Sequence, residues 1–208
     1  MASHAEHAPL PEDFSFTFDP SVAAWNHPVA TYNKLNNKAW DGLVASAFVF
    51  HPSKDRILLV QRAAHDSGAL HWEAPGGAVD AEDPTILHGA CRELYEEAGL
   101  LAKHVRRTIG EGEGFDKGEN GGGFTFTTRR GLVCCGWSFV VEVDEGEVEK
   151  GVKLDPNEHE DHVWASEEEV KSGKVGEKSI PMVSAVQFRR VLEAFRVRRE
   201  EGEMVRSE

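Results

Sequence analysis

Three glutamates that lie close together are the residues best suited to chemistry in this chain. Glu93, Glu96 and Glu97 are spaced by three and four residues, which places them on one face of a predicted helix. Like charges at these spacings destabilise a helix by roughly 0.2–0.5 kcal/mol per pair. A divalent cation bound by the carboxylate oxygens would offset the repulsion. The alternative is a solvated acidic face, the commoner meaning of such a pattern taken alone.

The surrounding sequence predicts how these glutamates are positioned. A short strand ends in a Pro-Gly-Gly turn at residues 75–77, and a helix is expected at about residues 84–98. Asp83 is the expected N-cap, and Gly99 is expected to end the helix in the left-handed conformation. Glu97 borders the apolar face of this helix, so we expect at least one carboxylate to be partly shielded from water.

This turn and helix resemble the Nudix box, the signature of the Nudix hydrolases. The signature runs glycine, five residues, glutamate, seven residues, then Arg-Glu, an aliphatic residue, any residue, Glu-Glu, any residue, glycine and an aliphatic residue. The matching residues are Gly77, Arg92, Glu93, Leu94, Glu96, Glu97, Gly99 and Leu100. There are two departures: Asp83 replaces the first glutamate, and eight residues rather than seven separate it from Arg92.

The resemblance implies an α/β protein, a Nudix-like α/β/α sandwich with a mixed sheet. It implies hydrolysis of a phosphoanhydride in a nucleoside diphosphate linked to another moiety, by attack of water at phosphorus. The implied cofactor is Mg²⁺, with Mn²⁺ as an alternative, bound by Glu93, Glu96, Glu97 and the carbonyl oxygen of Gly77. Arg92 would orient one of these carboxylates; otherwise it would simply pair with Glu96 one turn away.

The general base is expected to be a glutamate of the box or an acid in the later segment at residues 157–164. In that segment Glu160 is the predicted residue, with Glu158 and Asp161 as alternatives. The competing interpretation is a solvated acidic turn before a strand. The resemblance and the residues therefore leave the identity of the base open.

Substrate contacts are predicted at two places outside the three glutamates. Gly76 and Gly77 form the turn, and Arg62 ends a predicted strand where it could contact a phosphate or simply face solvent. His71 and His159 lie near candidate segments, but a lone histidine beside a motif is more often incidental. Neither histidine is assigned a role.

Composition limits the partners of this protein. Acidic residues outnumber basic ones by 36 to 23, and the net charge of −13 argues against nucleic acid or an anionic membrane as a partner. No apolar run is long enough to span a bilayer, and the N-terminus lacks the features of a secretory signal. We therefore expect a cytoplasmic protein that acts on a small-molecule phosphoanhydride. The sequence does not predict its oligomeric state.

Three regions are expected along the chain. Residues 1–40 should form an irregular arm whose aromatic side chains pack on the domain, residues 41–198 the Nudix-like domain, and residues 199–208 a charged, frayed tail. The glycine-rich segment at residues 110–123 is predicted to be a mobile loop that can close over substrate.

A second class of function has to be weighed against the enzyme. A catalytically silent nucleotide-binding or regulatory module would keep the same fold. Loss of one or more glutamates of the box would favour this alternative. All three are present, so hydrolysis is the favoured expectation.

Overall fold

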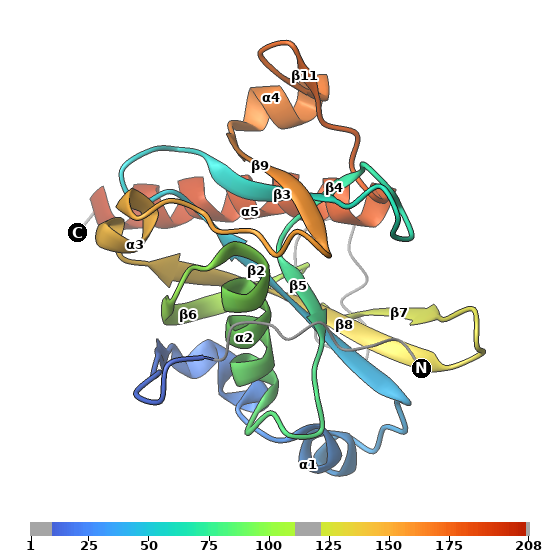
Figure 1. The fold of residues 1–208 in the computed structure, drawn as a ribbon. Coiled ribbons are helices and arrows are strands. Elements are labelled where there is room, and N and C mark those ends of the chain that lie inside the picture. Colours follow the sequence, from blue (N-terminus) through green and yellow to red (C-terminus); the bar gives the residue numbers. More distant parts are fainter. Residues whose placement is uncertain (1–9, 111–121, 207–208) are drawn as a thin grey trace.

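The computed structural model describes residues 10–110 and 122–206 as strands and helices arranged in layers (Figure 1). The strands are β1 (Thr17–Phe18), β2 (Gly42–Val49), β3 (Ile57–Arg62), β4 (Trp72–Glu73), β5 (Gly76–Ala78), β6 (Ala102–Ile109), β7 (Phe124–Thr127), β8 (Val133–Val143), β9 (His159–Ala165), β10 (Lys174–Val175) and β11 (Lys178–Ser179). The helices are η1 (Pro20–Trp25), α1 (Val29–Leu35), α2 (Ile86–Ala98), α3 (Glu145–Glu149), α4 (Glu167–Ser172) and α5 (Ala185–Arg206).

The main sheet has the strand order β1-β6-β8-β2-β5, with β7 also paired to the long strand β8. It is mixed, because β2 runs parallel to β8 and antiparallel to β5. Along β2, Ala45 and Ala47 contact one hydrophobic core and Phe48 contacts the other. A strand buried on both faces needs a nearly continuous apolar sequence, which explains the composition of β2.

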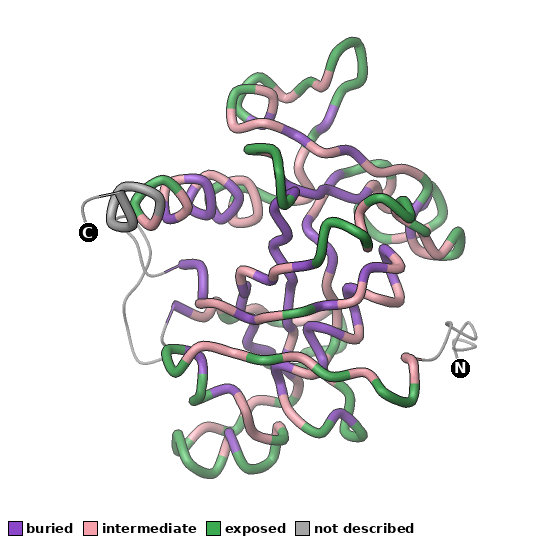
Figure 2. Tube along the Cα trace, turned by 90° about the vertical axis from the view of Figure 1, so that its left-hand side faces the viewer, coloured by how far each residue is buried: buried purple, intermediate pink, exposed green. Residues whose placement is uncertain are grey.

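Helices cover both faces of the main sheet. Helix α2 packs in one core against β2, and α5 packs in the other core together with the smaller sheet β4-β3-β9. Figure 2 shows the buried residues concentrated along the strands between these layers. The expected α/β/α sandwich with a mixed sheet is therefore confirmed.

Helix α2 begins later than its sequence predicts. Its N-cap is Thr85, whose hydroxyl oxygen accepts a hydrogen bond from the backbone N–H of His88 at 3.0 Å. The prediction that Asp83 is the N-cap is wrong, because its carboxylate accepts hydrogen bonds from Arg92. The predicted end is confirmed: Gly99 has φ 66° and donates its N–H to the carbonyl of Tyr95.

The N-terminal arm contains more regular structure than expected. Strand β1 extends the main sheet by parallel pairing with β6, and two short helices follow. These helices bury Val22, Trp25 and Tyr32 in the core that also holds α2. Apolar burial therefore orders a segment that the prolines had led us to expect as irregular.

The C-terminal helix α5 continues to Arg206, whereas we expected a frayed tail over residues 199–208. The predicted mobile loop at residues 110–123 falls largely on residues 111–121, which lie outside the described residues. Among the helices that the structure describes, none is long and apolar enough to cross a membrane.

Candidate active site

A cavity of about 330 Å³ lies where α2, β5, the end of β3 and the start of β9 meet. Its lining residues are Arg62, Asp66, Gly76, Gly77, Ala78, Asp80, Arg92, Glu93, Glu96, Glu97, Glu158 and His159. The structure thus brings together all the predicted site residues except Glu160. Glu158, one of the two alternatives to Glu160, also lines the cavity, and His159 at the start of β9 is an addition to the predicted residues.

Two of the three glutamates of the box are buried beside Gly76 and Gly77, which pair with β2 as part of strand β5 and do not form the expected turn. Glu93 is 9% exposed and Glu97 is 5% exposed. The backbone N–H of Gly76 donates to Glu97 Oε2 at 2.7 Å. A Cβ atom on Gly77 would lie only 2.6 Å from Glu93 Oε2, so glycine is needed there for the carboxylate to fit. Strand β5 and helix α2 are therefore matched to each other in shape.

Burial makes these carboxylates hold protons tightly in the absence of a cation. Burial is the main cause that raises the pKa of Glu93 to about 8; the charge of Arg92 opposes the shift, and the charge of Glu96 adds to it. The pKa of Glu97 is raised well above its usual value, first by burial and then by the charge of Glu93. A bound cation would stabilise both groups in the charged form.

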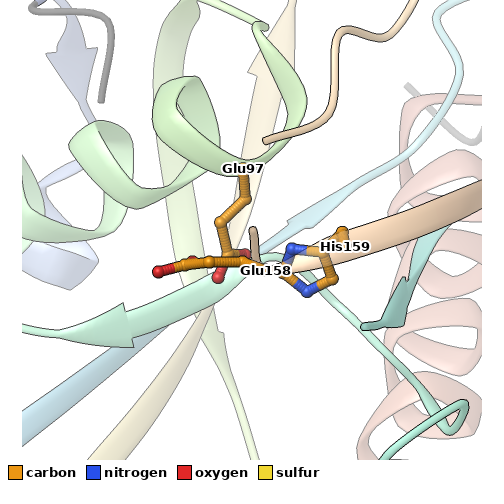
Figure 3. Close-up of side chains that lie close together, drawn as sticks. All are labelled: Glu97, Glu158 and His159. Carbon is orange, nitrogen blue, oxygen red and sulfur yellow. The ribbon is translucent and has the colours of Figure 1, made fainter. Parts of the chain in front are cut away.

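The donor set fits a divalent cation. Glu97, Glu158 and His159 each offer a ligand atom, and these atoms lie within 4.8 Å of one another (Figure 3). Among the described residues, six acidic and two basic side chains line the cavity, an excess of four negative charges when all are ionised. Such a cavity repels phosphate groups unless cations neutralise it.

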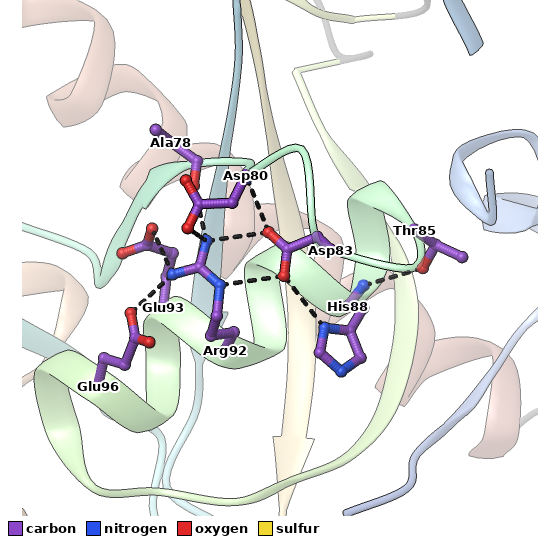
Figure 4. Close-up of polar contacts among 8 residues, drawn as sticks. All are labelled: Ala78, Asp80, Asp83, Thr85, His88, Arg92, Glu93 and Glu96. Carbon is purple, nitrogen blue, oxygen red and sulfur yellow. Dashed lines mark hydrogen bonds and ion pairs between the residues drawn. The ribbon is translucent and has the colours of Figure 1, made fainter. Parts of the chain in front are cut away.

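Arg92 connects the helix to the preceding loop (Figure 4). Its Nε and Nη2 atoms donate to the two carboxylate oxygens of Asp83 at 3.0 and 2.9 Å. Its Nη1 atom donates to Glu96 Oε2 at 2.6 Å and to Glu93 Oε1 at 3.1 Å. The ion pair with Glu96 and the orienting role that we weighed as alternatives therefore coexist in one side chain.

Asp83 holds Arg92 from the position where the signature has glutamate. Its side chain is almost fully buried. Although burial works in the opposite direction, hydrogen bonds from His88 and Arg92 lower the pKa of Asp83 to about 2. The shorter acid and the extra residue of the loop thus still provide a charged partner for the arginine.

Glu160 lies outside the cavity lining, contrary to our expectation. Its Oε1 atom accepts a hydrogen bond from the backbone N–H of Ala64 at 2.7 Å. The cause is a β-bulge: Gln61 pairs with Asp161, but Arg62 pairs with His159 rather than with Glu160. Because one extra residue reverses which side chain faces a given side of a strand, His159 occupies the face that Glu160 would otherwise take.

Arg62 lines the cavity, and each of its three nitrogens donates a hydrogen bond within the protein. It forms ion pairs with Asp66 and Glu73, and its Nε atom donates to the carbonyl of Ser67 at 2.6 Å. The predicted contact with phosphate stays a prediction. The ion pair with Glu73 shows in addition that Arg62 positions this carboxylate.

Only a weak feature of the amino-acid sequence indicated His159 as a site residue. A histidine followed directly by alternating strand residues is unremarkable by itself. The signal was its position beside Glu158, at the start of the segment that supplies the later acid. Only the register between β3 and β9 places it in the cavity.

Comparison with known proteins agrees with this geometry. The family model of the NUDIX domain matches residues 41–186, more than two thirds of the chain. The chain therefore belongs to the NUDIX family.

Two curated relatives match over shorter segments. The chain is 38% identical over 66 residues to the CMP-5'-(N-acetyl-N-hydroxy-3-aminopropyl)phosphonate hydrolase of Streptomyces rubellomurinus, over 31% of each chain. It is 36% identical over 67 residues to an RNA pyrophosphohydrolase of a Psychrobacter species, over 32% of this chain and 36% of the relative. The matches thus span about a third of the length of these relatives.

Solved structures share the fold. The NUDIX domain of Shewanella oneidensis NrtR, in complex with ADP ribose, aligns with a TM-score of 0.52 and 18% identity over 82% of this chain and 95% of that domain. A MutT NUDIX hydrolase from Burkholderia pseudomallei aligns with a TM-score of 0.50 and 19% identity over 72% and 97% of the two chains. At this level of identity the similarity concerns the fold alone.

Proposed function

We propose that this protein hydrolyses a phosphoanhydride in a nucleoside diphosphate linked to another moiety, with Mg²⁺ or Mn²⁺ as cofactor and water as the nucleophile. The observation that carries the proposal is the pair of buried carboxylates, Glu93 and Glu97, facing an acidic cavity. Two relatives with matching segments, one acting on a CMP-linked phosphonate and one on RNA, are named as a hydrolase and a pyrophosphohydrolase. The assignment of this substrate class to the present protein is likewise our proposal.

The cavity residues have separate roles in cation binding, positioning and proton transfer. Glu96, Glu97 and the carbonyl oxygen of Gly77 hold the cation, with Glu93 as a further ligand or as the base. When bound, the cation neutralises phosphate charge and lowers the pKa of a bound water. Arg92 keeps the carboxylates in place through the bonds described above.

Glu93 is the best-placed base among the cavity carboxylates. Arg92 reaches Glu93 Oε1 at 3.1 Å, a longer distance than its bond to Glu96, so the Glu93 carboxylate is held less tightly and is better able to accept a proton from water. The N–H of Gly76 fixes Glu97 instead, and Arg92 fixes Glu96 at short distance. The proton leaves water for Glu93 while the water oxygen forms the new bond to phosphorus and the bridging oxygen departs with the other product.

The proposal is tested by turnover of a substrate panel in the presence of Mg²⁺ or Mn²⁺. The panel contains nucleotide sugars, ADP-ribose, dinucleoside polyphosphates, NADH, oxidised nucleoside triphosphates and a CMP-linked phosphonate. Hydrolysis in ¹⁸O-labelled water should place one label on a phosphate product, because water attacks phosphorus. Binding of these compounds without turnover would favour the silent regulatory module.

The variants Glu96→Gln and Glu97→Gln test the metal assignment. Each should lower kcat at least about 100-fold, because loss of one electrostatic stabiliser commonly costs about 2.7–4 kcal/mol in the transition state. Glu82→Gln is the matched control, since Glu82 is an exposed acid on the loop before α2. Near-normal kcat in both site variants, or full turnover in excess chelator, would contradict the proposed mechanism.

A further inference from the structure

His159 is a buried imidazole whose ring nitrogens are both without a hydrogen-bond partner among the described residues. The residue is 2% exposed, and neither Nδ1 nor Nε2 makes a hydrogen bond with the part of the chain that the structure describes. Buried polar groups in folded proteins are rarely left without a hydrogen bond, because desolvation without a partner is unfavourable. An unpaired buried imidazole that lines a cavity therefore points to a ligand.

The neighbours of His159 identify the kind of ligand. One of its ring nitrogens lies within 4.8 Å of carboxylate oxygens of both Glu97 and Glu158. Ligand atoms about 2.1 Å from one ion lie at most about 4.2 Å apart, so small side-chain rotations suffice to close the three ligands around a cation. Two carboxylates and an imidazole form a ligand set for a divalent metal ion.

The surroundings of His159 also match those of a metal-binding histidine. Such a histidine commonly donates its second ring N–H to a carboxylate. Here Nε2 lies 3.8 Å from Glu73 Oε1, and Glu73 is held in turn by Arg62. The bulge in β9 places His159 on the same face of the small sheet as these two residues. Arg62, the predicted phosphate ligand, thus has a role behind the metal site.

We propose that His159 is a nitrogen ligand of a divalent cation shared with Glu97 and Glu158, and that it shifts the preference of the site from Mg²⁺ towards Mn²⁺ or Co²⁺. The physical reason is that Mg²⁺ favours oxygen ligands, whereas imidazole suits first-row transition ions. The proposal rests on the proposed function, because Glu97 belongs to both ligand sets. It adds a specific donor and a consequence for metal choice.

The experiment measures cation binding rather than turnover. Full-length protein freed of metal is titrated with Mn²⁺, Co²⁺ and Mg²⁺ by calorimetry, and the Mn²⁺ form is studied by pulsed electron paramagnetic resonance for coupling to ¹⁴N. The variants are His159→Gln, Glu97→Gln and the matched control His71→Gln. His71 is an exposed histidine beside β4 that is not among the residues lining the cavity.

The wild-type protein should bind Mn²⁺ at least about tenfold more tightly than Mg²⁺ and show ¹⁴N coupling. In His159→Gln the coupling should disappear and the affinity for Mn²⁺ should fall about 10–100-fold, with the affinity for Mg²⁺ changed less than about twofold. His71→Gln should behave as wild type.

Different failures point to different errors. Absence of ¹⁴N coupling in the wild-type protein overturns the role of His159, even if His159→Gln fails to fold. Coupling that persists in folded His159→Gln has the same meaning. If the wild-type protein binds none of the three cations, or Glu97→Gln binds them normally, the metal assignment in the proposed function fails and the role of His159 fails with it; loss of only the ¹⁴N coupling, with cation binding intact, overturns the role of His159 alone.

Discussion

At the scale of single residues, the raised pKa values of Glu93 and Glu97 have a consequence for stability. Between the usual glutamic acid value of 4.5 and about 8, folded protein without metal holds a proton on Glu93 that the unfolded chain has released. The free energy of unfolding should therefore fall as pH rises through this range, by up to about 1.4 kcal/mol per pH unit for each extra proton. Thermal unfolding in chelator from pH 5.5 to 8 measures this slope.

The variant Glu97→Gln isolates the carboxylate pair from other titrating groups. Glutamine cannot ionise and does not repel Glu93, so the fall in melting temperature with pH should be shallower than in wild type. The control Glu82→Gln should keep the wild-type slope. Equal slopes in wild type and Glu97→Gln would show that the buried pair is not what titrates.

At the scale of elements, helix capping and the anchoring of Arg92 are carried out by two different residues of the loop before α2. Thr85 caps the helix, whereas Asp83 anchors Arg92 and through it the glutamates. Asp83→Ala should destabilise the protein by about 1.5–3 kcal/mol, the value of hydrogen bonds to a charged group, and should also lower kcat. Thr85→Ala should cost about 1 kcal/mol and leave kcat nearly unchanged. Unfolding and steady-state kinetics of both variants provide the measurement.

A different result for Asp83→Ala would mean that Asp83 acts as a helix cap, as the sequence predicted. If Asp83→Ala changed only stability, by about the amount expected of a lost N-cap, Arg92 would not depend on Asp83 for its position. A conservative variant, Asp83→Glu, tests the reach of the acid separately. This variant has the residue type of the family signature but keeps the longer loop. Its kcat should therefore lie between that of Asp83→Ala and that of the wild-type protein.

At the scale of the whole molecule, the core extends beyond the segment that matches the family. Trp25, at 6% exposure, packs edge-on against Trp137 and Phe139 of β8, although it precedes residue 41. Trp25→Ala should destabilise the protein by about 3–5 kcal/mol and lower its melting temperature by roughly 10 °C. The exposed Leu35 in α1 provides the control, since Leu35→Ala removes little buried surface. A melting temperature unchanged by Trp25→Ala would show that the arm does not contribute to the core.

The sequence alone determined the features that depend on local spacing. These features are the carboxylates at i, i+3 and i+4, the left-handed Gly99 and the apolar run of β2. They follow from the periodicity of helices and strands, which depends only on residues close together in the chain. For the same reason the box positions Glu93, Glu96 and Glu97 could be placed on one helix face without knowledge of the fold.

Tertiary structure decided the features that depend on pairing between distant segments. The cap is Thr85 and not Asp83 because Arg92, nine residues further along the chain, binds the aspartate. His159 rather than Glu160 reached the cavity because a bulge shifts the register of β9 on β3, and register is a property of two strands together. Local patterns specify which residues share a face; only packing specifies what that face meets.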